Sequence, residues 1–305
     1  VLRAARRALR EEMPRRVARL EAAVDDAFAW LPSQRIAWEG TPIARLRPGA
    51  TALRPLVEVL DSEFLDSGAR ERVRQRLQRY IDAEVRDVLA PLFAAAEVAE
   101  RESALRGPMH RLTEGLGVAP QAEDAAAPAL RSRLKAMGVR VGRRGLFLPA
   151  LLKPRPAARR AALWALRRGE PVPSLPAPGL VAMAPPEDWP VGFATALGWV
   201  AAGPMLVRLD IAERVGAELT WNSRRGPVPV PADLASRLSV RAELLPAVLH
   251  GLGFRLFPAA PLAQEQFGPP APAMMAPQRR PAATPPRHPA PRQDGPFAAL
   301  AALRP

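Results

Sequence analysis

Two long segments of the chain carry apolar residues at helical spacing. In the segment from Leu2 to Leu31 these residues lie three or four positions apart, and Pro14 suits the first turn of a helix, so we expect helix in two pieces. A second apolar stripe runs from about Arg70 to Phe93, and its members are Val73, Leu77, Ile81, Val85, Val88, Leu89 and Leu92. Charged residues fill the positions outside that stripe, which predicts an amphipathic helix.

Between these segments the pattern changes to one typical of a β-hairpin. Short apolar runs at Ile36–Trp38 and Pro42–Leu46 flank the dipeptide Glu39-Gly40, which predicts a hairpin near 36–46. Proline cannot donate a hydrogen bond to a β-ladder. Pro42 therefore predicts that the return strand lies at the edge of its sheet.

Proline content marks the expected domain boundaries. Gly169 suits a helix C-cap, and the proline-rich run after it reads as a linker. The expected parts are a helical domain at 1–169, a linker at 170–190, a small α/β domain at 191–258, a disordered Pro-rich tail at 259–295 and a short apolar motif at 296–305. The fold class predicted is mainly α with a small β-hairpin, as two small helical domains joined by that linker.

Within 191–258, the run Pro204–Leu209 predicts a strand, and Asp210 with Glu213 forms a plausible capping pair for the helix that follows. The chain also contains an internal echo. "LTEGLGV" at 112–118 resembles "LASRLSV" at 234–240, and each is followed downstream by a similar ending, "LKAMGVR" and "VLHGLGFR". Two helix pairs built alike are therefore expected.

Composition adds a strong positive charge to this picture. The 305 residues hold 44 Lys and Arg against 30 Asp and Glu, a formal net charge of +14, and every basic residue except Lys135 and Lys153 is arginine. Such an excess favours polyanion partners, and a guanidinium forms bidentate contacts with phosphate. A GC-rich genome would raise the arginine content equally well.

The absence of certain residues and patterns narrows the possible kinds of site and partner. The chain has no cysteine, which excludes disulfides and thiolate metal sites and fits a cytoplasmic protein. No stretch of about 18 apolar residues is present, so no membrane partner is expected. The chain begins with Val1 inside an expected helix, as a fragment of a longer protein would.

The best candidate for polyanion binding is the basic segment from Arg140 to Arg160. No acidic residue lies between Asp124 and Glu170 in the sequence, and glycines in this region let a backbone approach phosphate closely. Its basic residues are Arg140, Arg143, Arg144, Lys153, Arg155, Arg159 and Arg160. A solvated charged face is the alternative interpretation.

A second candidate is a helix-turn-helix at Leu234–Val248, whose second helix would start near Ala242. A recognition helix normally offers several Arg, Asn, Gln or Lys side chains to base edges, and here only Arg241 and Arg255 are close by. A helix pair packed for structural reasons is the alternative. Several tryptophans could stack on bases or serve as packing anchors, namely Trp38, Trp164, Trp189, Trp199 and Trp221.

Catalytic patterns are missing from the sequence. It contains no GxxxxGK[ST] phosphate loop and no GxSxG motif, and its histidines, His110, His250 and His288, lack metal-ligand spacing. No catalytic residue, metal ligand or cofactor site is therefore predicted in this chain.

Several phrases, in order, resemble one family. They are "IAWEGTPIARLRPGATALRP" at 36–55, "GVRVGRRGLFLPALLKP" at 138–154, "ALWAL" at 162–166, "GWVAAGPMLVRLDIAERV" at 198–215 and "PFAALAAL" at 296–303. They resemble the region after the motor domains of alphaproteobacterial Suv3-like superfamily 2 (DEAD/DEAH-type) helicases. The chain departs from that family at 118–128 and in extra Pro and Gly of the second domain, as a divergent or degraded copy would.

The resemblance implies a non-catalytic, nucleic-acid-binding accessory region of an ATP-dependent RNA or DNA helicase. ATP and Mg²⁺ would belong to the missing motor. The partners implied are RNA or DNA, helicase motor domains in cis and an exoribonuclease. Two other functions stay open: a helix-turn-helix DNA-binding regulator that uses Leu234–Arg255, and a protein-docking scaffold that uses the terminal "PFAALAAL".

Overall fold

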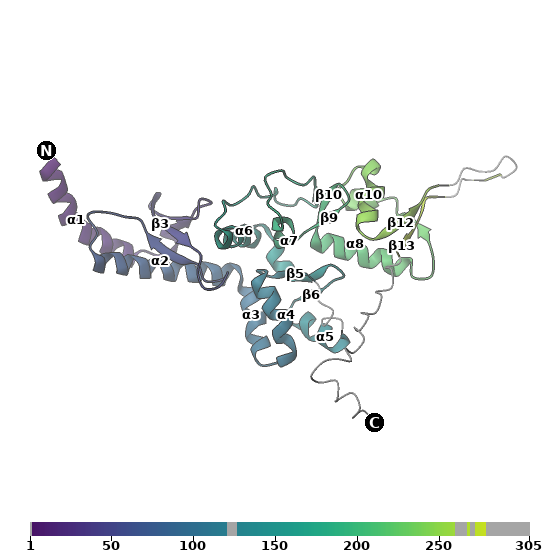
Figure 1. The fold of residues 1–305 in the computed structure, drawn as a ribbon, viewed down its shortest axis with the longest axis horizontal. Helices are drawn as coiled ribbons and strands as arrows, with labels where there is room; N and C mark the ends of the chain where they lie inside the picture. Colours follow the sequence, from purple (N-terminus) through teal and green to yellow (C-terminus); the bar gives the residue numbers. More distant parts are fainter. Residues whose placement is uncertain (1, 121–126, 260–266, 269–271, 279–305) are drawn as a thin grey trace, which may run out of the picture.

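The computed structural model describes residues 2–120, 127–259, 267–268 and 272–278. Long helices extend toward the N-terminal end, and small sheets with short helices fill the remainder (Figure 1). About 48% of the structure is helix and 18% is strand, so the fold is mixed α and β and the prediction of a mainly α fold was wrong. All the described strands outside the first sheet have only two to four residues, too few for a period-two pattern to stand out in the sequence.

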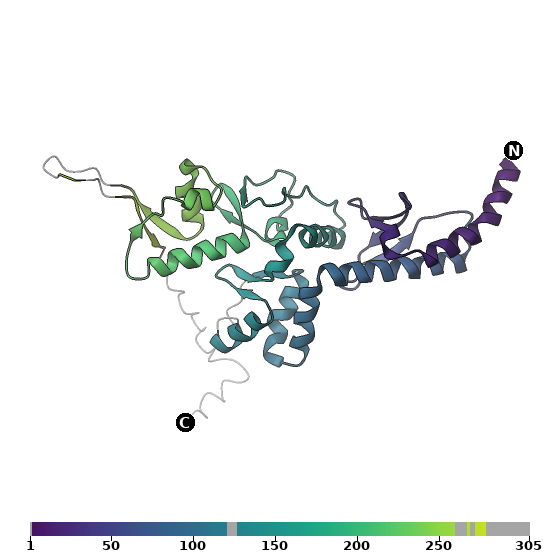
Figure 2. The same cartoon turned by 180° about the vertical axis from the view of Figure 1, so that it is seen from behind.

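The N-terminal part packs two long helices, α1 (Leu2–Ala22) and α2 (Ser67–Val88), with a four-stranded antiparallel sheet. The strands, in spatial order, are β1 (Phe28–Trp30), β2 (Arg35–Trp38), β3 (Thr41–Arg47) and β4 (Leu56–Val59). Figures 1 and 2 show this sheet lying against α2. The α2 helix starts where the Asp66 side chain accepts a hydrogen bond from the Ala69 N–H at 2.7 Å, and its apolar stripe is buried as predicted.

The predicted hairpin is present as β2 and β3, and its turn residues Glu39 and Gly40 have φ values of 48° and 77°. Pro42 nevertheless lies in a central strand, because β3 pairs with β4 as well as with β2. The pairing with β2 shifts register between Ile36 and Ala37, and such a bulge accommodates a proline. Phe28, expected in a helix, lies in β1 instead, since α1 ends at Ala22.

After α2, the helix α3 (Ala90–Glu100) leads into three consecutive units with a shared order of elements: a helix, a strand, one helix (two short helices in the third unit) and two strands. Unit A consists of α4 (Ser103–Glu114), β5 (Val118–Pro120), α5 (Pro128–Ala136), β6 (Arg140–Val141) and β7 (Gly145–Phe147). Unit B consists of α6 (Pro154–Arg168), β8 (Ala182–Met183), α7 (Phe193–Leu197), β9 (Trp199–Ala202) and β10 (Met205–Arg208).

Unit C consists of α8 (Leu209–Asn222), β11 (Val228–Pro229), the short helices α9 (Leu234–Arg237) and α10 (Leu245–Gly251), β12 (Phe254–Phe257) and β13 (Met274–Pro277). In all three units the last strand lies between the other two and pairs antiparallel with both. Single 3₁₀ turns occur at Asp25–Ala27, Pro149–Leu152 and Ala242–Leu244. The chain therefore repeats one supersecondary unit three times.

A glycine occupies the same place in each unit, between the last helix and the strand after it. Gly138, Gly198 and Gly253 have φ values of 79°, 87° and 87°. Each donates its N–H to the carbonyl three residues before it, at 3.0, 3.0 and 2.9 Å. The next residue in each case (Val139, Trp199 and Phe254) is buried. A positive φ is what glycine allows most readily, so this residue reverses the chain from helix to strand.

The internal echo is thus correct in its second half only. "LKAMGVR" and "VLHGLGFR" both span the helix, glycine and strand of their units. The first halves differ, because Leu112 lies near the end of the first helix of unit A, whereas Leu234 begins a later helix of unit C. Unit B is a further copy, which the sequence comparison missed.

The predicted linker is folded onto unit B in the structure. Residues 182–183 form β8, and the Trp189 Nε1–H donates to the Ser174 carbonyl at 2.8 Å. The Trp189 ring also meets Phe193 edge-on, with centroids 4.9 Å apart. In the predicted tail, Met274–Pro277 form strand β13, and the terminal motif at 296–305 lies outside the described residues.

Candidate nucleic-acid interface

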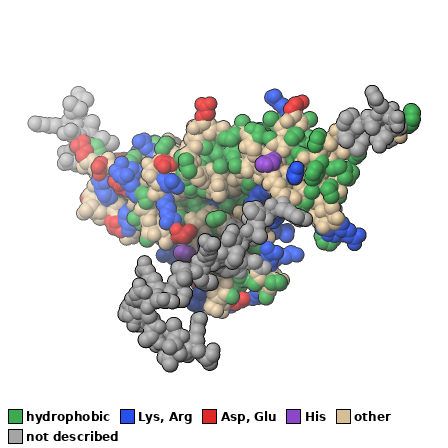
Figure 3. Space-filling view, turned by 45° about the vertical axis from the view of Figure 1, so that its right-hand side comes forward, with side chains coloured by type: hydrophobic (Ala, Val, Ile, Leu, Met, Phe, Trp, Pro, Cys, Tyr) green, Lys and Arg blue, Asp and Glu red, His purple; other side chains and the backbone are tan. Residues whose placement is uncertain are grey.

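Acidic and basic side chains are interspersed over the end of the molecule that carries α1 and α2 (Figure 3). Two of the predicted binding residues point into this mixed surface from α6. Arg155 pairs with Glu84 at 3.0 Å and Asp87 at 2.9 Å, both on α2. Arg159 pairs with the same Glu84 at 2.9 Å and stacks over the Trp30 ring, 4.7 Å from its centroid. The basic segment from Arg140 to Arg160 has no acidic residue of its own, and carboxylates of α2 supply the neutralising charge to Arg155 and Arg159.

Arg160 is buried and belongs to the core. Only 1% of its surface is exposed, although it was predicted to contact nucleic acid. Its guanidinium donates to the carbonyls of Leu116 at 2.6 Å, Leu151 at 3.2 Å and Leu197 at 3.5 Å, and also to the carbonyl of Ala196. Burial lowers the pKa of Arg160 to about 10, so it stays charged at neutral pH. This side chain joins units A and B and cannot reach a phosphate at the surface.

Arg143 and Arg144 form the turn between β6 and β7, and this turn is fixed to α8. The Glu213 carboxylate accepts the backbone N–H groups of both residues, at 2.8 and 2.6 Å. The Arg143 guanidinium donates to the Thr220 hydroxyl at 3.0 Å, and that of Arg144 donates to the Leu252 carbonyl at 2.5 Å. Glu213 thus anchors unit A to unit C and is no capping residue.

Some of the exposed cations in this part of the chain have no carboxylate to pair with among the described residues. Arg140 and Lys153, from the predicted set, are exposed, and so are Arg131 and Lys135, which lie one helical turn apart on α5. Throughout the ranges that the structure describes, none of these four side chains has a carboxylate partner. We call Arg131, Lys135 and Arg140 the α5–β6 cation surface, because α5 leads directly into β6. Sequence reasoning missed Arg131 and Lys135, whose signal was their spacing of four residues.

Unit C has the elements of a helix-turn-helix followed by a β-hairpin, with its second helical segment starting at Ala242 as predicted. The face of α10 is poor in groups that read bases, since Glu243, Pro246 and His250 are exposed on this segment. The helices are also short: α9 has 4 residues and α10 has 7.

The turn between β9 and β10 packs closely against α10. A Cβ atom added at Gly203 would lie 2.6 Å from the Ala247 carbonyl oxygen, and one added at Gly251 would overlap the backbone of Gly203. Unit B therefore occupies part of the surface that a groove-reading helix needs. Arg241 and Arg255 are exposed beside this helix, and Arg255 lies over the Phe257 ring at 5.2 Å.

The six tryptophans divide clearly by exposure. Trp30, Trp38 and Trp199 are buried, and Trp164 and Trp189 pack around Phe193. Trp221, at the end of α8, is 66% exposed. Its ring carries the guanidinium of Arg224, 4.0 Å from the ring centroid.

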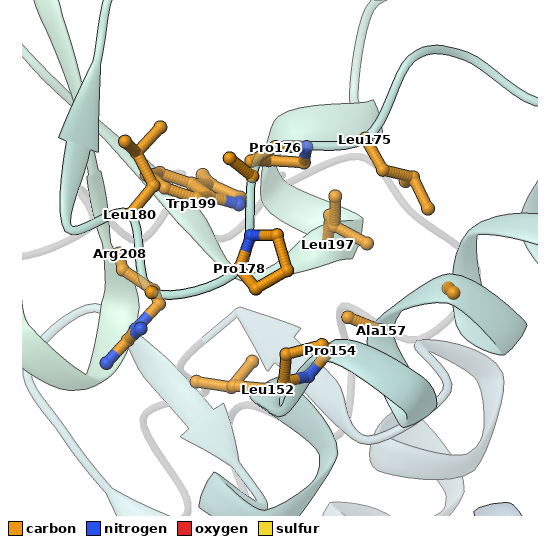
Figure 4. A pocket seen from close by; sticks show the side chains of 13 residues that line it. Leu152, Pro154, Ala157, Leu175, Pro176, Pro178, Leu180, Leu197, Trp199 and Arg208 are labelled. Atoms are coloured by element: carbon orange, nitrogen blue, oxygen red, sulfur yellow. The ribbon is translucent and has the colours of Figure 1, made fainter.

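An apolar pocket lies between α6, β9 and the proline-rich segment at 175–180, with a volume of about 330 Å³ (Figure 4). Its labelled side chains are Leu152, Pro154, Ala157, Leu175, Pro176, Pro178, Leu180, Leu197, Trp199 and Arg208. Arg208 is the one ionisable residue of its lining, and Asp210 accepts hydrogen bonds from it at 2.7 and 3.0 Å. A nucleophile and a general base are therefore both missing from this pocket.

No helix among the described residues is long and apolar enough to cross a bilayer. No group of three or more His, Cys, Asp or Glu residues there is placed to hold a metal ion. In the comparisons with known proteins, no family model, no curated protein and no solved structure matches this chain.

Proposed function

We propose that this chain is a nucleic-acid-binding accessory region that holds RNA or DNA by its phosphates. The observation that carries the proposal is the α5–β6 cation surface: three exposed cations on adjoining elements, without a carboxylate partner in the part of the chain that the structure describes. Exposed cations of this kind can exchange their counterions for phosphate oxygens. Cations that already have a carboxylate, such as Arg155, gain less from such an exchange.

The proposed binding depends little on base sequence. The exposed side chains of the second helix of unit A include Arg131, Ser132 and Lys135, which suit phosphate contact, and no Asn or Gln lies on α5. The turn between β9 and β10 packs against α10 of unit C, which disfavours the alternative of a sequence-reading regulator. Contacts to the nucleic-acid backbone are therefore favoured over contacts that recognise its bases.

The resemblance to the region after the motor of Suv3-like helicases supports a more specific role within the same proposal. In that role the chain guides a strand beside an ATP-dependent motor, which would carry the ATP and Mg²⁺ sites. An exoribonuclease partner belongs to the same expectation.

The test is binding of labelled single-stranded RNA, single-stranded DNA and duplex DNA, measured by fluorescence anisotropy across a salt series. A triple variant, Arg131→Gln, Lys135→Gln and Arg140→Gln, should bind a single strand more weakly, because each lost phosphate contact lowers the slope of log K against log salt by about 0.7, or about 2 in all. The matched control, Arg54→Gln, Arg79→Gln and Arg101→Gln, removes the same charge from exposed arginines elsewhere.

Equal losses in the two triple variants would mean that only net charge matters and would overturn the assignment of the surface. No binding by the wild-type chain at low salt would overturn the proposed function and favour a protein-docking scaffold. A single consensus recovered from random duplexes would favour the helix-turn-helix regulator.

A further inference from the structure

Of the six tryptophans, all of which lie among the described residues, one stands outside every core. Trp221 is 66% exposed at the C-terminal end of α8, whereas the other five tryptophans are packed. An indole in water leaves a large apolar area unburied, and such areas often mark contact sites. The exposed indole buries little apolar area within the fold, so a binding role accounts for its exposure better than a packing role.

The surroundings of Trp221 are arginine-rich. The Arg224 guanidinium stacks on the ring at 4.0 Å, and its Nη1 donates to the Trp221 carbonyl at 2.8 Å, which holds the cation on one ring face. Arg225 follows and is exposed. Because most of the indole surface is still open, a second flat group can stack on it while the guanidinium remains in place.

The end of α8 that carries Trp221 also lies next to the β6–β7 turn. Arg143, in the turn after β6, donates to the hydroxyl of Thr220, the residue before Trp221. The β6–β7 hairpin thus runs from the α5–β6 cation surface to the end of α8, and these elements are neighbours in Figure 1. A strand held by phosphate along this hairpin would arrive at the end of α8 that carries Trp221.

We propose that Trp221 is a stacking platform for one base of single-stranded nucleic acid, with Arg224 and Arg225 holding the adjoining phosphates. The ligand is a single strand because the base faces of a duplex are already stacked on one another, whereas those of a single strand are free. The arginines beside the ring favour a polyanion over an apolar protein surface. This inference rests on the proposed function and identifies the strand type and the residue that recognises it.

The experiment separates base contacts from phosphate contacts. Affinities of the full chain are measured for a single strand of ordinary bases and for an abasic strand of equal length, which has the same phosphates and no bases. We expect Trp221→Ala to weaken binding of the ordinary strand about 5- to 150-fold, the range for one lost stack, and to leave abasic binding and the salt slope unchanged. Trp221→Phe should retain part of the affinity.

The control is Val191→Ala, which trims another highly exposed apolar residue, 93% exposed. Equal losses on both strands, or no loss on either, would overturn the stacking role while the salt dependence still tests the proposed function. A Trp221→Ala variant with normal strand binding that fails only on a duplex would also overturn it. Failure of the wild-type chain to bind either strand would instead remove the proposed function itself.

Discussion

Arg155, Arg159 and Arg160 lie within two turns of α6 and meet different environments. The first two are partly or largely exposed and pair with carboxylates on α2, whereas Arg160 is enclosed by backbone carbonyls. Their residue type and spacing were visible in the sequence, and their partners were not, because Glu84 lies 71 positions before Arg155. Charge density along a chain therefore predicts a polyanion site only after distant neighbours have been placed.

Replacing Arg160 should cost about 3 kcal/mol of unfolding free energy or more. An Arg160→Met variant keeps most of the volume but removes the donors for buried carbonyls in units A and B, and unsatisfied buried groups are expensive. Urea denaturation measures this loss. Arg167→Met, on the same helix, removes only an exposed pair with Glu114 and should change stability by less than about 1 kcal/mol. Similar losses in the two variants would contradict a structural role for Arg160.

At the scale of elements, long amphipathic helices were predictable and most short strands were not, although the strand expected at Pro204–Leu209 is present as β10 (Met205–Arg208). The apolar stripe of α2 is buried as its spacing indicated, and the hairpin at β2 and β3 followed from its turn. Strands such as β6 and β8 have two residues each, which is too short for any pattern. The helix–glycine–strand motif could have revealed β6, β9 and β12, and the internal echo showed it at two of these three positions.

The three glycines of this motif allow a comparative test. Gly138→Ala and Gly253→Ala should each lower the unfolding free energy by about 1 kcal/mol, because an L-residue resists positive φ while the space beside each is open or in ordinary contact. Gly198→Ala should cost more, since its Cβ would also overlap the Leu152 side chain. Thermal or urea unfolding measures all three.

The control for this series is Gly68→Ala in the first turn of α2, where φ is not positive and neighbours lie at 3.4 Å or beyond. Alanine there should be neutral or should stabilise the helix by about 0.5 kcal/mol. If the three motif glycines behaved like Gly68, the shared left-handed conformation would not be what the fold requires at these positions.

At the scale of the whole molecule, neighbouring units are held together by a few polar anchors in addition to apolar clusters. Arg160 joins units A and B, and Glu213 joins unit A to unit C. The close approach of Gly203 and Gly251 joins units B and C. No repeat period in the sequence indicates these anchors, because each unit uses a different one. Helix and strand patterns in the sequence predict the secondary structure within a unit, whereas the arrangement of the units depends on single residues.

Glu213 is the anchor whose loss should change binding most selectively. It accepts the N–H groups of Arg143 and Arg144, and these hold the β6–β7 turn against α8 beside Thr220. Glu213→Ala should therefore raise the hydrogen-exchange rates of those two amides, since an amide without its acceptor opens more readily to water. The fold should otherwise survive, because Glu213 is only partly buried and no apolar cluster depends on it.

The same variant should weaken binding of an ordinary single strand, because a released turn no longer aligns the α5–β6 cation surface with Trp221. Abasic strands, which depend on phosphate contacts alone, should lose less. The matched control is Glu218→Ala, on the same helix, whose partner Arg237 lies within unit C at 2.9 Å. It should leave the exchange of Arg143 and Arg144 unchanged. Equal effects of the two variants on the turn would show that the hairpin is positioned by packing and not by the Glu213 carboxylate.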